Sequence, residues 1–166
     1  MTVTTTISSP VGPITLAGHD GVLTGLYMDD QRHAPMARED WARDDDAFAD
    51  VAAQLDAYFA GTLTTFDLEL DTSAGTPFQQ RVWATLRTIP YGETMSYGQL
   101  AAEIGQPTAS RAVGMANGRN PIGIIVPCHR VVGSKGDLTG YAGGLDRKRR
   151  LLDLEQKVAS SLMRRA

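Results

Sequence analysis

One short stretch, IIVPCHRVV at residues 124–132, places the only cysteine of the chain directly before a histidine and an arginine. A thiolate is a strong nucleophile, and a nearby histidine can accept the proton of the thiol, so Cys128 and His129 are candidates for nucleophilic chemistry. Adjacent residues on a strand point to opposite faces, so the two side chains can cooperate only if the backbone turns or a water bridges them. The alternative is that Cys128 is an inert, small apolar residue of the core.

A carboxylate further along the chain could complete this pair. The segment from Leu145 to Ser160 has helical periodicity, and Glu155 falls on its apolar stripe, where a carboxylate needs a partner. A histidine oriented by Glu155 could draw the proton from Cys128, and we then expect the pKa of Cys128 to fall below about 8.5. Otherwise Glu155 lies at an exposed edge of the stripe or pairs with a basic neighbour. These neighbours are Lys148, Arg149 and Arg150.

The elements around these residues divide the chain into two parts. The first part contains β-branched, alternating segments separated by turn residues, a helical pattern from Ala47 to Ala60, and a further alternating segment, TFDLEL, at residues 65–70. We therefore expect a small antiparallel sheet with one helix. The acidic segment 29–46 is predicted to be a surface loop with solvated charges. Its basic residues are Arg32, Arg38 and Arg43.

The second part is predicted to be mostly helical. Thr76 can cap a helix that has proline at its first position, and Ser96 and Gln99 form a capping box for a short helix over residues 97–104. A second short helix follows at about 109–117, which gives the pattern of a helix-turn-helix. Residues 122–126 read as a buried strand that ends at Pro127. The predicted fold class is α+β, with domains at 1–75 and 76–166.

The second short helix has small side chains and one long cation, Arg111. Small residues such as Ala112 and Gly114 let a helix backbone approach a surface closely, although the same residues also allow tight helix packing. Charge favours a DNA surface, because residues 1–74 carry a net charge of −10 and residues 75–166 carry +7. A pair of oppositely charged, solvated faces is the alternative interpretation.

The composition of the chain argues against several classes of protein. The longest apolar run is about five residues, far short of the roughly 20 that a membrane span requires, and the N-terminus has no signal-peptide pattern. A single cysteine forms neither an internal disulfide nor a thiolate zinc site, and a free thiol fits a reducing cytoplasm. We see no dimerisation segment and expect a monomer with no obligate protein partner and no membrane association.

The motifs NPIGIIVPCHRVVG and GYAGGLDRKRRLLDLE closely resemble the active-site region of the O6-alkylguanine-DNA alkyltransferases, which are also called methylated-DNA–protein-cysteine methyltransferases. TPFQQRVWATLRTIPYGETMSYGQLAAEIG and SRAVGMANGRNP resemble their helix-turn-helix module. The resemblance is dense over residues 76–156 and weaker before them. It implies direct-reversal repair, in which O6-alkylguanine is flipped out of double-stranded DNA and its alkyl group passes irreversibly to the protein's own cysteine.

The resemblance also implies a role for each site residue. Cys128 would accept the alkyl group, His129 would act as base through a water, Glu155 would orient the histidine, and Asn120 would be a hinge. Tyr97, Val131, Tyr141 and Ala142 would hold the base, Arg111 would fill the gap that the base leaves, and Ala112, Gly114 and Tyr97 would contact DNA. Many relatives have serine at position 142, where this chain has alanine. Some relatives bind zinc through N-terminal cysteines, which this chain lacks, so we expect no metal and no cofactor.

Two other functions use the same features. A cysteine hydrolase would use a Cys–His–Glu triad but would need an oxyanion hole and would turn over repeatedly. A helix-turn-helix regulator would bind DNA sequence-specifically with a structural Cys128, and such proteins usually dimerise to read palindromic sites.

Overall fold

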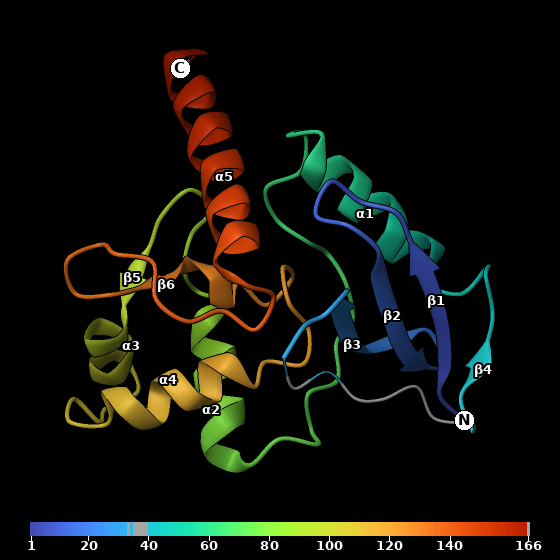
Figure 1. Ribbon diagram of the computed structural model, residues 1–166, viewed down its shortest axis with the longest axis horizontal. Helices are drawn as coiled ribbons and strands as arrows, with labels where there is room; N and C mark the ends of the chain where they lie inside the picture. The colour runs from blue at the N-terminus through green and yellow to red at the C-terminus, as the bar shows by residue number, and fades with distance from the viewer. Residues whose placement is uncertain (33, 35–39, 166) are drawn as a thin grey trace.

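The computed structural model describes residues 1–32, 34 and 40–165, and the predicted loop cation Arg38 lies outside them. Its N-terminal part is built on a four-stranded sheet (Figure 1). Strand β2 (Ile14–His19) pairs antiparallel with both β1 (Val3–Ile7) and β3 (Val22–Met28). The short β4 (Ala42–Arg43) pairs parallel with β1. Helix α1 (Ala49–Phe59) buries its apolar stripe in the same core as the inward side chains of the sheet.

The predicted strand at residues 65–70 is wrong. Only an isolated bridge between Leu23 and Leu70 joins this segment to the edge of β3. The reason is that the side-chain amide of Gln54 on α1, 13 positions earlier, binds both backbone groups of Asp67. Gln54 accepts from the Asp67 N–H and donates to the Asp67 carbonyl, at 2.9 Å each. Backbone groups engaged by a side chain are not free to form a strand ladder.

The C-terminal part contains the predicted helices. Helix α2 (Pro77–Leu86) begins at Thr76 and α3 (Tyr97–Glu103) begins at Ser96, each with a reciprocal capping box that uses a glutamine three residues on. Helix α4 (Ser110–Gly118) packs against both α2 and α3, which gives the helix-turn-helix arrangement. The predicted helical starts at residues 76 and 96 are therefore confirmed, because these caps depend on side chains only three residues apart.

Residues 122–126 are buried as predicted, but they form turns rather than a strand. Ile124 has a positive φ of 69°, and the Val126 N–H donates to the Ile122 carbonyl at 3.0 Å. Asn120 imposes this conformation, since its side chain accepts from the Ile122 N–H at 3.0 Å and donates to the Val126 carbonyl at 2.8 Å. The chain then enters the 3-10 helix η1 (Cys128–Arg130) and β6 (Val131–Val132), which pairs parallel with β5 (Met95–Ser96).

Helix α5 (Leu145–Arg165) packs against η1 and extends beyond the rest of the molecule at its C-terminal end (Figure 1). Side chains from both parts of the chain form one continuous core, and Leu26 of β3 bonds through its N–H to the Pro121 carbonyl at 2.9 Å. The architecture confirms the predicted α+β class. Over the described residues, no helix has the combination of length and apolarity that crossing a membrane requires.

Candidate active site

Cys128 is the first residue of η1, where the backbone turns tightly after Pro127. Its side chain is 5% exposed, and its carbonyl accepts a hydrogen bond from the Asn117 side-chain amide of α4 at 3.3 Å. The turn replaces the strand geometry that would have pointed Cys128 and His129 to opposite faces. The thiol is therefore held between the helix-turn-helix and α5 rather than in the interior of a sheet.

His129 is fully buried and directly contacts the predicted carboxylate. Its Nε2 lies 2.7 Å from Oε2 of Glu155, which is also fully buried. An ionised carboxylate only accepts hydrogen bonds, so this contact places the imidazole proton on Nε2. The other ring nitrogen, Nδ1, is buried and has no hydrogen-bond partner among the described residues. It is free to accept a proton. Of the sequence alternatives for Glu155, neither an exposed edge nor pairing with the nearby lysine and arginines of α5 occurs.

Two further donors bind the same carboxylate. Arg130 donates from Nε to Oε1 at 2.8 Å and from Nη2 to Oε2 at 3.0 Å, and the Tyr58 hydroxyl of α1 donates to Oε2 at 2.6 Å. Burial alone would raise the pKa of Glu155, but the hydrogen bonds and charges of His129 and Arg130 outweigh it and lower that pKa to about 2. Glu155 is therefore an anion throughout the physiological range.

The expected fall in the pKa of Cys128 is wrong for the unliganded protein. Burial raises the pKa of the thiol, and the opposing effects of the Asn120 side chain and the Lys148 ammonium are smaller. Burial also lowers the pKa of His129 despite the Glu155 carboxylate, so the imidazole is neutral near pH 7. Before substrate binds, the Cys128 thiol and the His129 imidazole are thus both neutral, because burial disfavours a thiolate and an imidazolium.

Of the four residues predicted to hold the base, three line a hollow of about 130 Å³. Tyr97, Tyr141 and Ala142 line it, whereas Val131 is fully buried in β6 and its N–H is already bonded to the Cys128 carbonyl. The Tyr97 hydroxyl donates to the Thr139 carbonyl at 3.0 Å, which links Tyr97 to the loop whose Gly140 also lines the hollow.

Three of the residues predicted to contact DNA lie on α4, and the fourth, Tyr97, is the first residue of α3. Arg111 and Ala112 are exposed, and Gly114 lines the same hollow with the Tyr97 ring beside it. A β-carbon at position 114 would lie 3.7 Å from that ring, in ordinary van der Waals contact with it. Asn120 is buried and shapes the turn before Pro127, as described above. Asn117 at the end of α4, which bonds to the Cys128 carbonyl, and Asn120 in the turn that follows therefore link the helix to the segment that carries the thiol.

Four contributors were not predicted as site residues from the sequence. Arg130 and Tyr58 bind Glu155. Lys148 is fully buried, donates to the carbonyls of Thr139 and Gly140 at 2.8 and 3.1 Å, and has its pKa lowered by burial to about 8. Arg32 is exposed, as the interpretation of a solvated loop charge expects, but it also lines the hollow, and its backbone N–H donates to the Ala142 carbonyl at 2.9 Å. The PCHR motif offered a signal only for Arg130.

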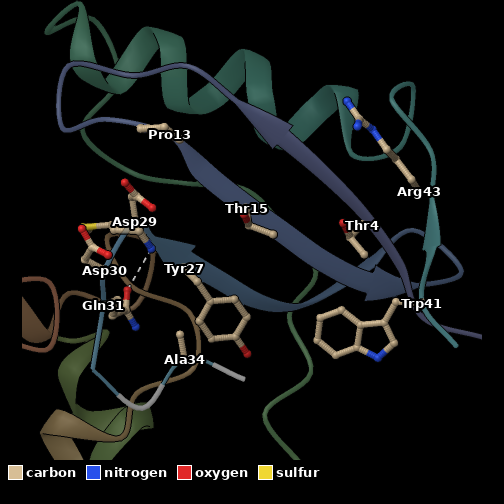
Figure 2. A pocket seen from close by; sticks show the side chains of 11 residues that line it. Thr4, Pro13, Thr15, Tyr27, Asp29, Asp30, Gln31, Ala34, Trp41 and Arg43 are labelled. Atoms are coloured by element: carbon tan, nitrogen blue, oxygen red, sulfur yellow. Dashed lines mark hydrogen bonds between the residues drawn. The ribbon is translucent and has the colours of Figure 1, made fainter. Parts of the chain in front are cut away.

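A second hollow, of about 450 Å³, lies over the outer face of the sheet and contains none of the predicted site residues (Figure 2). Thr4, Thr15 and Tyr27 come from β1, β2 and β3, with Trp41 and Arg43 at one side. They alternate with the buried residues of the same strands, so this face is the one turned away from the core. In the described part of the chain, no three His, Cys, Asp or Glu side chains are grouped to hold a metal ion.

Comparison with protein families gives two matches. The family model described as "6-O-methylguanine DNA methyltransferase, ribonuclease-like domain" matches residues 2–72, and the one described as "6-O-methylguanine DNA methyltransferase, DNA binding domain" matches residues 77–157. This chain belongs to the 6-O-methylguanine DNA methyltransferase family. The resemblance seen in the sequence is thereby confirmed, and family membership supports neither the cysteine hydrolase nor the helix-turn-helix regulator.

Similar members of the family are found in bacteria and archaea. The methylated-DNA–protein-cysteine methyltransferase of Mycobacterium tuberculosis is 62% identical over 154 residues, which cover 93% of this chain and 92% of the relative. The protein of that name from Methanosarcina acetivorans is 52% identical over 147 residues, with 89% and 94% covered. The crystal structure of M. tuberculosis OGT in complex with DNA has a TM-score of 0.89 at 60% identity, with 94% of each chain covered.

Proposed function

We propose that this family member repairs O6-alkylguanine in double-stranded DNA by transferring the alkyl group irreversibly to Cys128. The observation that supports the assignment best is the buried His129, whose Nε2 is bound by Glu155 and whose Nδ1 has no partner among the described residues. Such a histidine has one nitrogen available to accept a proton, and the only thiol of the chain is the preceding residue. This combination is what an activated cysteine nucleophile requires.

The reaction uses each of these groups in turn. The proton of the Cys128 thiol passes, through a bridging water, to Nδ1 of His129, and Glu155 stabilises the imidazolium that forms. The sulfur attacks the alkyl carbon, the carbon–oxygen bond breaks, and guanine leaves with the electron pair. A hydrogen bond from a donor such as the Tyr97 hydroxyl stabilises the negative charge on the purine, and the proton held by His129 returns through the bridging water to give neutral guanine. The product is a thioether, and no group in the relay of Cys128, His129 and Glu155 can cleave it.

The resting ionisation of the site fits this sequence of events. Burial keeps Cys128 protonated and His129 neutral, so the thiolate forms only as the proton is transferred. A buried neutral thiol is also protected from oxidation and from other electrophiles. Reactivity is thus coupled to the arrival of a substrate in the hollow.

The helix-turn-helix supplies access to the damaged base. An alkyl group on guanine O6 is unreachable inside the base stack, so the nucleotide must rotate out of the duplex. We assign Arg111 as the side chain that fills the vacated space, Ala112 and Gly114 as points of close backbone approach, and Asn120 as the hinge toward the thiol. The base would then enter the hollow beside Tyr97, Tyr141 and Ala142, with backbone groups near Val131 completing the pocket.

We further propose that the two parts, residues 1–75 and 76–166, are separate domains and that the protein acts in the cytoplasm.

The experiment that tests the proposed function is a titration with excess duplex that carries O6-methylguanine labelled in the methyl group. We expect label transfer to stop at one equivalent per protein molecule, since each thioether is final. Continued turnover would contradict the proposal and point to a hydrolase.

A further inference from the structure

Tyr58 links the N-terminal part of the chain to the Cys128–His129–Glu155 relay. It lies near the C-terminal end of α1, is fully buried, and donates its hydroxyl to Oε2 of Glu155 at 2.6 Å across 97 positions of sequence. The same oxygen accepts from Nε2 of His129 at 2.7 Å. A residue outside the helix-turn-helix part therefore binds the atom that orients the proposed base.

The position of this hydroxyl is fixed by the packing of the tyrosine ring. The ring centroid lies 5.2 Å from that of Phe59 in an edge-on contact, 5.4 Å from Phe66 and 6.2 Å from Tyr91. The end of α1 is also held against α5, since the α-carbon of Gly61 faces the Val158 side chain so closely that a β-carbon there would lie 3.0 Å from it. A hydroxyl held from three sides keeps a constant direction toward the carboxylate.

We propose that Tyr58 is a positioning residue for alkyl transfer, which acts on His129 through Glu155. It fixes the orientation of Oε2, and by donating a hydrogen bond it withdraws negative charge from this oxygen. A less basic carboxylate raises the basicity of its histidine partner less. Tyr58 thereby adds to the effect of burial, which keeps His129 neutral at physiological pH and able to accept the thiol proton. The inference rests on the proposed function for its effect on the rate, but not for its effect on His129.

Other charged groups around His129 also shift its pKa. From η1, the Arg130 guanidinium lowers the pKa of His129, and from α5 the Lys148 ammonium also lowers it, while Glu155 raises it. Tyr91 and Tyr141 are neutral phenols whose pKa values are raised, mainly by burial. Removing only the hydroxyl of Tyr58 leaves Arg130, Lys148, Tyr91 and Tyr141 in place and changes only the hydrogen bond to Glu155, so that substitution isolates its contribution.

Tyr58→Phe removes the hydroxyl and keeps the ring. The matched control is Tyr91→Phe, because the Tyr91 hydroxyl is buried in the same aromatic cluster but has no hydrogen-bond partner among the described residues. In Tyr58→Phe we expect the pKa of His129 to rise by about one unit, so that the acid limb of the alkylation rate moves to higher pH and the rate below that limb falls about tenfold. Tyr91→Phe should match the wild-type protein in both respects.

The two quantities are measured separately, below the thermal midpoints of both variants. The pKa of His129 is read from NMR spectra of histidine-labelled protein, with the signal assigned by its absence in His129→Gln. The rate is measured with the free base O6-benzylguanine. Unchanged pKa values in Tyr58→Phe, or equal shifts in both variants, would overturn the inference. Failure of the wild-type protein to react would instead overturn the proposed function, and the NMR titration, which needs no substrate, would still decide the role of Tyr58.

Discussion

Glu155→Gln should destabilise the protein strongly, because the carboxylate is the only counter-charge that the described residues offer to the buried Arg130 guanidinium. Arg130 makes two hydrogen bonds to Glu155, and its third hydrogen bond is to the Ile89 carbonyl at 2.7 Å. Glutamine keeps one acceptor oxygen, but its NH₂ group would face the donors of Tyr58, His129 and Arg130. Breaking one side of a buried ion pair costs about 3–5 kcal/mol, a large share of the roughly 5–15 kcal/mol that stabilises a typical domain.

The free energy of unfolding is measured by urea titration with the fluorescence of the buried Trp83 as the signal. For a chain of this size, the loss corresponds to a fall of about 6–20 °C in thermal midpoint. The double variant Arg130→Met/Glu155→Gln is the control. It should lose less than the sum of the two single variants, because no buried charge is left without its partner.

The pH dependence gives an independent check. The pKa of Glu155 is about 2 in the folded protein against an ordinary value of 4.5, so its contribution to stability is present above pH 4.5 and is lost as the pH falls toward 2. The gap in unfolding free energy between wild type and Glu155→Gln should therefore narrow over this interval. A loss below about 1 kcal/mol at pH 7, typical of an exposed ion pair, would refute the account of Glu155 as the buried centre of the relay.

Two further predictions concern the approach to DNA and the turn before the thiol. Arg111→Ala should impair alkyl transfer from duplex DNA much more than transfer from free O6-benzylguanine, because only the duplex requires flipping. Equal losses on both substrates would mean that Arg111 supports the fold. Asn120→Ala should lower the free energy of unfolding by about 2 kcal/mol, since it leaves the Ile122 N–H and the Val126 carbonyl buried without their partner. Wild-type stability in urea titration would show that the turn forms without this side chain.

Local chemistry explains which elements could be predicted from the sequence. The starts of α2 and α3 depend on Thr76 with Gln79 and on Ser96 with Gln99, pairs that lie three residues apart and are visible in any window. Glu155 was placed on a buried face by helical spacing alone, and the structure brings it to His129. The caps depend on residues close in sequence, and the position of Glu155 follows from the regular helical spacing of buried residues.

The errors arose where a side chain competes for backbone groups at a distance. Gln54 removes Asp67 from a strand across 13 positions, and Asn120 folds an apolar run that reads as a strand into turns. The expected fall in the pKa of Cys128 neglected burial, which periodicity does not quantify. Tyr58 contacts Glu155 across 97 positions, and no pattern in a single sequence relates the two.

The most direct test of the central claim is the intact mass of the protein after mixing with a duplex that contains O6-methylguanine, followed by peptide mapping. We expect a gain of one methyl group, located on Cys128, with no further gain on longer incubation. Cys128→Ala should bind the duplex and gain no mass. A methyl group on another residue, or an unmodified protein alongside repaired DNA, would contradict the assignment of Cys128 as the alkyl acceptor.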